Sequence, residues 1–403
     1  MILRRGKVPK VPHTEFRVGG RLALEEIHGT YGFSGPHSRK MHLRYPTVQA
    51  ALPVPASLDL TPRPPAGRLA LQPYHIRAGA IPHAGDAVTG RIPLVYGPST
   101  TVSAVKPKAS MPADVFFRNG DRHELWFVQD GTGVLETEFG ALSWKKGHYV
   151  VVPKATTCRW TLSSPRAFLL LVESVFPIVF APHHLNAAGQ ATLMAPIVET
   201  EVEAPEFAGP VDRLGRFRVL VKHDGGLVSR LTLAHHPFDL IGWEGALYPF
   251  AFPISSHHGI AREMHTAPPI HQTFQAGQAP FSGFSICSFV PQIEGWHPKE
   301  VPAPYAHHNV DSDECMFFSN ADYGARKGVI EEGSLTFHPG SLPHSPHGRA
   351  AETSLRDRGR MSGRLAVMLD TFFESLRVTA QGRRWRDLDY ALSWARADGR
   401  SGT

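Results

Sequence analysis

Two stretches of this chain repeat the same spacing of turn residues, and this repeat constrains the fold more than any other feature. In the later stretch Gly333 is followed six residues on by Pro339, and in the earlier stretch Gly147 is followed six residues on by Pro153. Matching intervals in two distant parts of one chain are typical of a duplicated structural unit. The spacing therefore predicts two copies of one domain.

Short runs rich in β-branched and aromatic residues recur along the chain between turn signals. They are ELWFVQ, GVLETEF, HYVVVP, AFLLLVES, RLTLAHH, FSICSFVP, GSLTFHP and RLAVMLDTFF. Proline (35 residues) and glycine (37 residues) are spread throughout, and long helical periodicity is almost absent. This pattern predicts an all-β sandwich or barrel. The best helix candidate is RRWRDLDYALSWARA, and the tail DGRSGT after it is expected to be disordered.

Each copy of the repeat also has a glutamate before its glycine–proline pair and one further residue five positions after the proline. The glutamate is Glu124 in the earlier copy and Glu314 in the later one, and the final residue is Cys158 or His344. This is the two-motif pattern of a cupin barrel. We therefore predict a bicupin, which is two β-sandwich or jelly-roll barrels with a few short helices.

The earlier barrel is predicted to be degenerate because it lacks metal-binding side chains. Phe117, Arg118 and Asn119 stand where the histidines of the motif would be, and Cys158 replaces the last histidine. Four regions are expected: an extension with strands packing on the barrels (1–100), the degenerate barrel (101–180), a connecting β region (181–280), and the second barrel with a C-terminal helix and tail (281–403).

The later copy carries a candidate metal site made of His307, Glu314 and His344. Side chains on adjacent barrel strands can converge because alternate residues point inward. His308 is an alternative to His307, but neighbouring residues on an extended segment face opposite ways, so only one can reach a metal. His344 occupies the motif position rather than His347.

Two imidazoles and one carboxylate suit Fe(II) with open positions for other ligands, although Mn, Ni and Zn also accept nitrogen and oxygen donors. His338, six residues before His344, is expected close to the metal as a hydrogen-bond donor. Asp311 and Asp313 are interpreted as turn and solvated residues of the HNVDSDE loop.

The composition excludes several other classes of protein. The net charge is +6, but no block of lysine and arginine stands out, so nucleic acid is not an expected partner. No apolar run is long enough to cross a membrane, and the basic N-terminus lacks the apolar stretch of a secretory signal. The three cysteines, Cys158, Cys287 and Cys315, are far apart, which argues against a disulfide framework and favours the cytoplasm.

Several segments of the chain resemble the homogentisate 1,2-dioxygenase family, specifically its bacterial branch. They include EFRVGGRLALEEIHGTYGFSG, HELWFVQDGTGVLETEFGALSWKKGHYVVVP, PPIHQTF, PYAHHNVDSDE, GSLTFHPGSLPHSPHG and RLAVMLDTF. The resemblance covers nearly the whole chain, and the C-terminal motifs are its specific part. It implies a trimer-based homo-oligomer with Fe(II) at His307, Glu314 and His344.

The resemblance also implies roles for other residues. His265, in MHTAPPIHQ, falls on the family's acid–base histidine, with His271 as a rival for the same role. The resemblance thus implies that the connecting region 181–280 contributes the active-site histidine and that 281–403 holds the catalytic barrel. Tyr323 falls on a tyrosine that contacts the substrate, and His338 on a histidine beside the metal. Arg326 falls on a lysine that meets the substrate carboxylate, which is a departure because the two side chains bind carboxylates differently.

The function implied is an Fe(II)-dependent, extradiol-type ring-cleaving dioxygenase that uses O2 to convert homogentisate to maleylacetoacetate in tyrosine and phenylalanine breakdown. His265, Tyr323 and His338 would be catalytic, and Tyr323, Arg326 and His338 would contact the substrate. One alternative is a dioxygenase for gentisate or another hydroquinone. The other is a metal cupin that is not an oxygenase, either an isomerase or a binding protein.

Overall fold

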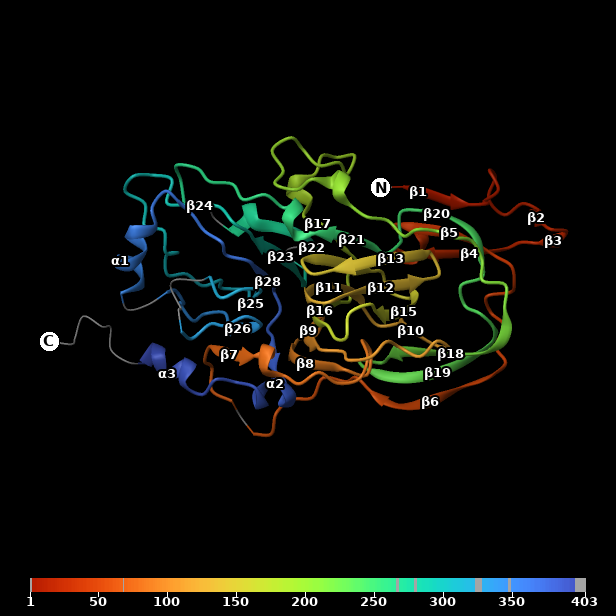
Figure 1. The fold of residues 1–403 in the computed structure, drawn as a ribbon, viewed down its shortest axis with the longest axis horizontal. Coiled ribbons are helices and arrows are strands. Elements are labelled where there is room, and N and C mark those ends of the chain that lie inside the picture. Colours follow the sequence, from red (N-terminus) through yellow and green to blue (C-terminus); the bar gives the residue numbers. More distant parts are fainter. Residues whose placement is uncertain are drawn as a thin grey trace.

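Four β-sheets make up most of the molecule, which we describe from a computed structural model (Figure 1). The structure describes residues 2–67, 69–265, 268–278, 281–322, 328–346 and 349–395. All eight β-rich runs of the sequence form or contain strands, as predicted. The all-β bicupin prediction is confirmed, and its degenerate barrel is the N-terminal one.

Two seven-stranded sheets lie at the centre and contain the two copies of the repeat. The N-terminal central sheet has the order β21 (Phe250–Pro253), β14 (His148–Val152), β11 (His123–Asp130), β16 (Phe168–Ser174), β9 (Thr100–Val105), β8 (Arg91–Tyr96) and β29 (Arg377–Val378). The other central sheet carries the predicted metal ligand Glu314, and we name it the catalytic sheet, and its half of the molecule the catalytic half, after that prediction. Its order is β17 (Ile178–Phe180), β22 (Gln272–Gly277), β23 (Gly283–Phe289), β28 (Ala366–Phe372), β25 (Glu314–Phe318), β26 (Ser334–His338) and β7 (Tyr74–Arg77).

The register of these two sheets confirms the duplication. Glu124 on β11 lies opposite Val152 on β14 and Glu173 on β16. Glu314 on β25 lies opposite His338 on β26 and Asp370 on β28 in the same way. The two glutamates therefore hold equivalent positions in the two halves.

A third seven-stranded sheet covers the N-terminal central sheet. Its order is β13 (Gly140–Lys145), β12 (Thr132–Thr137), β15 (Thr157–Leu162), β10 (Val115–Asn119), β18 (Leu214–His223), β19 (Leu227–His235) and β6 (Ala51–Asp59). A four-stranded sheet of β1 (Leu3–Gly6), β20 (Leu240–Gly245), β5 (His37–His42) and β4 (Leu24–Gly29) lies at the N-terminal end of the molecule.

Two small ribbons, three short α-helices and several 3-10 helices complete the described elements. The ribbons pair β2 (Arg17–Val18) with β3 (Arg21–Leu22) and β24 (Ile293–Glu294) with β27 (Arg360–Met361). The α-helices are α1 (Ala350–Ser354), α2 (Ala380–Arg384) and α3 (Asp389–Ala395). The single C-terminal helix expected from the sequence is thus two short helices, and the tail expected to be disordered lies outside the described residues. None of the described helices is long and apolar enough to span a membrane.

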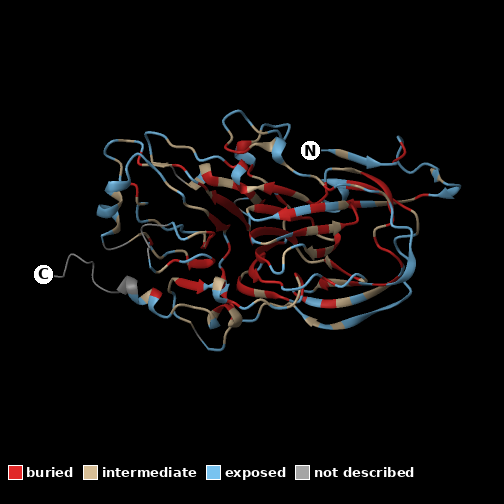
Figure 2. Ribbon diagram, in the orientation of Figure 1, coloured by how far each residue is buried: buried red, intermediate tan, exposed pale blue. Residues whose placement is uncertain are grey.

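The two central sheets are buried on both faces (Figure 2). Successive side chains of a strand point to opposite faces, and in these strands both sets are largely apolar. Phe127 on β11 and Phe317 on β25 belong to one core between the two sheets, with ring centroids 6.2 Å apart. Trp126 faces the other way, into a second core under the third sheet. Met316, next to Phe317, faces a cavity in the catalytic half. The catalytic sheet therefore has an apolar core on one side and the candidate site on the other.

Strands also cross between the halves. The edge strand β7, from the N-terminal part of the chain, pairs with β26, and β21 pairs with β14. The late strand β29 pairs with β8, and β17 pairs with β22. Each central sheet thus contains strands from the other half of the chain, while the region boundaries expected from the sequence stay a prediction.

Candidate metal centre

The backbone brings the two histidines of the candidate site together. The amide of His307 donates to the carbonyl of His344 at 3.0 Å, and the amide of His344 donates back at 2.8 Å. This bridge joins the segment before β25 to the segment after β26 and places the two imidazole centroids 4.5 Å apart. Glu314, the first residue of β25, is buried beneath them.

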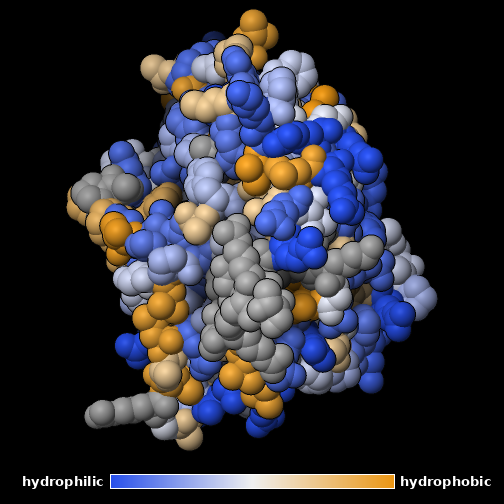
Figure 3. Space-filling view, turned by 90° about the vertical axis from the view of Figure 1, so that its left-hand side faces the viewer, coloured by the Kyte–Doolittle hydropathy of each residue, from blue (hydrophilic) through white to orange (hydrophobic). Residues whose placement is uncertain are grey.

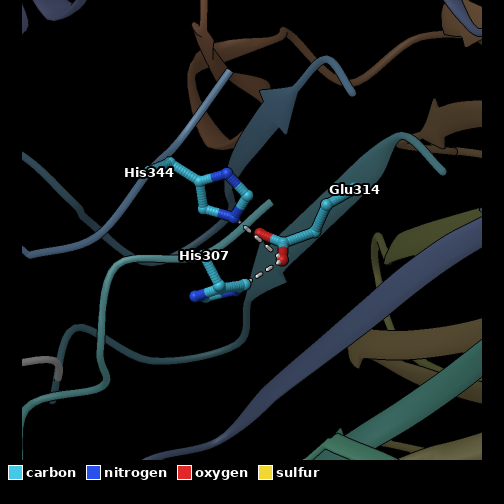
Figure 4. A group of neighbouring side chains, drawn as sticks. All are labelled: His307, Glu314 and His344. Carbon is cyan, nitrogen blue, oxygen red and sulfur yellow. Dashed lines mark hydrogen bonds and ion pairs between the residues drawn. The ribbon is translucent and has the colours of Figure 1, made fainter. Parts of the chain in front are cut away.

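The three side chains converge on one point (Figure 4). The Nε2 atoms of His307 and His344 lie 3.6 Å and 3.3 Å from Oε2 of Glu314, and one ligand atom from each residue lies within 4.8 Å of the others. The Nδ1 atoms face the carbonyls of Tyr305 and Leu342, at 2.9 Å and 3.3 Å. An Nδ1–H that donates to a carbonyl leaves Nε2 free to bind a metal. The donor set therefore fits a divalent transition metal.

His308, the alternative considered for His307, is not part of this group. The side chain of His308 is exposed, while that of His307 is turned toward Glu314. This difference follows from the opposite directions of neighbouring side chains on extended backbone. His347 lies outside the described residues.

The electrostatics of the group favour a charged carboxylate. Burial alone would raise the pKa of Glu314, but hydrogen bonds from His307, His338 and His344 hold it well below its usual value. The hydrogen bond to Glu314 raises the pKa of His307. Asp370, across from Glu314 on β28, has its pKa raised by burial and by the neighbouring charge of Glu314.

His338 connects Glu314 to the C-terminal helix α3. Its Nδ1 lies 2.9 Å from Oε1 of Glu314, and its Nε2 lies 3.0 Å from the hydroxyl of Tyr390. Tyr390 is 3% exposed, and its ring also packs 5.5 Å from that of His75 on β7. The sequence analysis did not find Tyr390, because a lone tyrosine on a short helix has no spacing that relates it to the metal motif.

Asp313 is buried, so its interpretation as a solvated residue was wrong. Its two carboxylate oxygens accept hydrogen bonds from the amides of Gly340 and Leu376, both at 2.6 Å. The side chain is 94% buried because these amides replace water as its partners. Asp313 thereby ties the start of β25 to the loop that leads to His344, whereas Asp311 is exposed as expected.

The three metal-ligand candidates line a cavity of about 200 Å³ at the catalytic end of the molecule. Its other walls include His265, His271, Phe289, Gln292, Glu294, Trp296, Glu300, Tyr305, Met316, Thr336, Arg364, Met368 and Tyr390. The surface of this end, which carries α1 and α3, mixes apolar and polar side chains (Figure 3). Apolar atoms make up most of the wall of this cavity, and the polar groups are set among them, as in other small-molecule sites.

His265 lies in the cavity wall and is 31% exposed. Its Nδ1 is 3.0 Å from Oε1 of Glu300, and its ring centroid is 5.2 Å from that of Tyr305. Tyr305 in turn lies 5.8 Å from the ring of His307, so its ring is close to both His265 and a metal-ligand candidate. The rival His271 is 2% exposed, and burial, with a smaller effect of Arg364, lowers its pKa to about 3. A histidine with so low a pKa is a weak base, which counts against His271 as a proton acceptor. Tyr323 and Arg326 lie outside the described residues.

Comparisons with known proteins agree with this architecture. Residues 97–254 match the family model described as "Homogentisate 1,2-dioxygenase N-terminal". The chain is 30% identical over 391 residues to a protein of Saccharolobus solfataricus named a "putative dioxygenase", covering 97% of this chain and 98% of that protein. It is 27% identical over 321 residues to the homogentisate 1,2-dioxygenase of Bradyrhizobium diazoefficiens, covering 73% of this chain and 68% of that one.

The chain belongs to the homogentisate 1,2-dioxygenase family. Among solved structures, a cupin 2 conserved barrel domain protein from Leptotrichia buccalis is similar with a TM-score of 0.32 and 8% identity, covering 74% of this chain and 95% of that one. The cupin architecture of this family member is identified by its own strand order and duplicated register.

The N-terminal half of this dioxygenase-family chain holds a modified counterpart of the metal centre. Phe117 lies opposite Cys158 as His307 lies opposite His344. Glu124, the equivalent of Glu314, accepts hydrogen bonds at 2.8 Å from the side chains of Arg91 and Asn119. Protein groups thus compensate the charge of this glutamate.

Proposed function

We propose that this protein is an Fe(II)-dependent ring-cleaving dioxygenase that acts on homogentisate or a close hydroquinone. The observation that carries the proposal is the convergence of His307, Glu314 and His344 on the wall of a mostly apolar cavity, in a chain of this family. With homogentisate the product would be maleylacetoacetate, an intermediate of tyrosine and phenylalanine breakdown.

His307, Glu314 and His344 would hold the iron. When bound there, Fe(II) supplies a redox-active centre that can take both O2 and an aromatic hydroxyl at its open positions. The same donors accept Mn, Ni or Zn, so the proposal of iron rests on the family together with the donor set. His338 donates to Glu314 and orients this carboxylate.

His265 is proposed as the general base for the phenolic proton. Its Nδ1 faces Glu300 at 3.0 Å, and a hydrogen bond donated from Nδ1 leaves Nε2 as the proton acceptor. Glu300 would then stabilise the imidazolium that forms. Tyr323 and Arg326 are proposed to contact the substrate, a role that rests on the resemblance.

His338 was expected to be catalytic and to contact the substrate. Both of its ring nitrogens have protein partners, Glu314 and Tyr390. We therefore propose that it acts mainly by fixing the position of Glu314, with Tyr390 as its anchor.

Two competing functions remain to be distinguished from this one. Gentisate or another hydroquinone would use the same ligands and the same base. A metal cupin that is an isomerase or a binding protein would not consume O2, and it would not need a base such as His265 in the cavity wall. The cavity position of His265 favours an oxygenase.

Oxygen uptake after anaerobic Fe(II) reconstitution tests the proposal directly. Homogentisate, gentisate and hydroquinone are supplied in turn, and the product is identified by mass. Uptake with a gain of both oxygen atoms in a ring-opened product is expected. Iron binding without uptake for any of the three would contradict the oxygenase assignment.

His265→Ala tests the base. The variant should keep its iron and lose roughly a hundred- to ten-thousandfold in rate, because general base catalysis contributes about that much. His258→Ala is the matched control, since His258 is exposed. Loss of iron in His265→Ala would instead make His265 a ligand.

Two properties of the protein as a whole complete the proposal. The family relation supports a trimer-based homo-oligomer, which light scattering would test. All three cysteines are free and buried, which suits a reducing compartment such as the cytoplasm.

A further inference from the structure

The cavity has a second polar end, away from the metal ligands. Glu314, Met316 and Phe318 of β25 and Met368 of β28 line one face of the cavity. In the register of these strands Glu314 lies opposite Asp370, Met316 opposite Met368, and Phe318 opposite Ala366. Arg364 continues this series two residues beyond Ala366. At about 3.3 Å per residue, roughly 20 Å of backbone separates Asp370 from Arg364. The metal-ligand candidates and Arg364 therefore line one cavity near opposite ends of this strand.

Arg364 is a largely buried cation at this second end. Its side chain is 17% exposed, its Nε lies 3.1 Å from Oε1 of Glu294, and its guanidinium carbon lies 5.4 Å from the ring centroid of Phe289. All three residues line the cavity. A buried ion pair is costly to desolvate, so apolar side chains would fill this wall at lower cost if the pair had only a packing role.

Gln292 lies in the same wall and is 6% exposed. Its Oε1 is buried without a hydrogen-bond partner among the described residues. The backbone of Gln292 is held in place, since its carbonyl accepts a hydrogen bond from the amide of Ser362 at 2.9 Å. Rotation of this amide by 180° exchanges Oε1 with Nε2 and turns N–H donors toward the same position, as a carboxylate ligand in this wall would require.

We propose that Arg364 and Gln292 form a carboxylate-binding subsite at the end of the cavity away from the metal ligands. Glu294 holds one part of the guanidinium and leaves other N–H donors for a carboxylate, to which Gln292 adds its amide N–H donors. The substrate class is then a hydroquinone with a carboxylate side chain, whose ring hydroxyl lies at the metal and whose carboxylate lies at Arg364. This assignment rests on the proposed function and replaces Arg326 as the principal carboxylate partner.

The test is calorimetry on the Fe(II)-reconstituted protein without oxygen, with homogentisate and with hydroquinone, which lacks the carboxylate. Arg364→Gln should weaken homogentisate binding roughly ten- to hundredfold, the value of a hydrogen bond to a charged group, and leave hydroquinone binding unchanged. Arg349→Gln, at an exposed arginine paired with Glu352, is the matched control and should change neither.

Further variants keep the test decisive if Arg364→Gln folds poorly with Glu294 left unpaired. Arg364→Lys keeps the charge and loses the planar fork, so it should weaken homogentisate selectively but less. The double variant Glu294→Gln/Arg364→Gln removes both charges and should lose the same selectivity. Equal effects on both compounds, or a selective loss in Arg326→Gln alone, would overturn the subsite. Failure of the proposed function is separate, since it would appear as absent oxygen uptake while the calorimetric difference between the two compounds persists.

Discussion

The two halves of the molecule share one strand framework, but the charge of the buried glutamate is compensated differently in each. In the catalytic half, Glu314 is surrounded by imidazoles that a metal can join. In the N-terminal half, its equivalent Glu124 is surrounded by the guanidinium of Arg91, the amide of Asn119 and the indole N–H of Trp126. A buried carboxylate needs a positive partner in both cases. The framework supplies the position, and the neighbouring side chains decide whether that partner is a metal or part of the protein.

The interiors of the two halves also differ in the side chains that occupy equivalent positions. Trp126 holds the position on β11 that Met316 holds on β25, two residues after the glutamate. Trp126, Trp144 and Trp160 pack against each other in the buried core of the N-terminal half. Met316 lines the cavity of the catalytic half instead. At this equivalent position a tryptophan fills the core of one half, and a methionine leaves room for a ligand in the other.

The largest expected effect comes from removing a ligand of the catalytic half. His344→Ala should abolish iron binding and oxygen uptake, because two donors cannot hold the metal as three do, and the protein should stay folded. Iron content by mass spectrometry and circular dichroism check this. Cys158→Ala, at the equivalent N-terminal position, should leave the iron content unchanged. Wild-type iron content in His344→Ala would contradict the ligand assignment.

The second prediction removes Arg91, a buried cation of the N-terminal half. Arg91→Met should destabilise the protein by about 3–5 kcal/mol, because it leaves buried Glu124 without a cationic partner and Glu173 with Lys222 alone. The shift of the urea midpoint measures this, and Arg63→Met, at an exposed pair with Asp59, should shift it little. Loss of bound metal from Arg91→Met with no loss of stability would contradict the comparison between the halves, because Arg91 would then act on the metal centre and not on the N-terminal core.

The third prediction concerns the anchor of Glu314. Tyr390→Phe removes the hydroxyl that bonds His338 and should weaken metal affinity roughly ten- to hundredfold, as the loss of a supporting partner usually does. Metal titration against a competing chelator measures it. Leu392→Ala, at an exposed position on the same helix, is the control. Affinity equal to that of the unmodified protein would show that Tyr390 only packs.

The smallest effects should appear on acidification, and the halves should respond at different pH. Imidazoles must be deprotonated to bind a metal, and the pKa of His307 is raised, so metal affinity should fall by up to about tenfold per pH unit below that pKa. Burial would raise the pKa of Glu173, but Lys222 and Arg91 lower it to about 2. Its stabilising contribution is present above its ordinary pKa and is lost only as the pH falls toward about 2. Metal release at higher pH than unfolding of the N-terminal core is therefore expected, and the reverse order would contradict it.

The sequence predicted features that depend on local periodicity or on fixed intervals. Strands such as β11 and β28 follow from their β-branched and aromatic runs, and the interval from Pro339 to His344 places this histidine beside Glu314. Tyr390 and Arg364 could not be found in this way. They reach the cavity because of long-range pairing, which no interval encodes. The burial of Asp313 likewise depends on two amides from distant loops.

The exchange of strands between the halves has a consequence for how the chain is made. β7 is synthesised early, but its partner β26 follows more than two hundred residues later, and β29 must return to β8 near the end of the chain. Neither central sheet can be completed until almost the whole chain is available. Such distant pairing predicts slow folding with exposed strand edges in the meantime. It also means that recombination cannot replace one half by a relative's half without matching the strands that each half lends to the other.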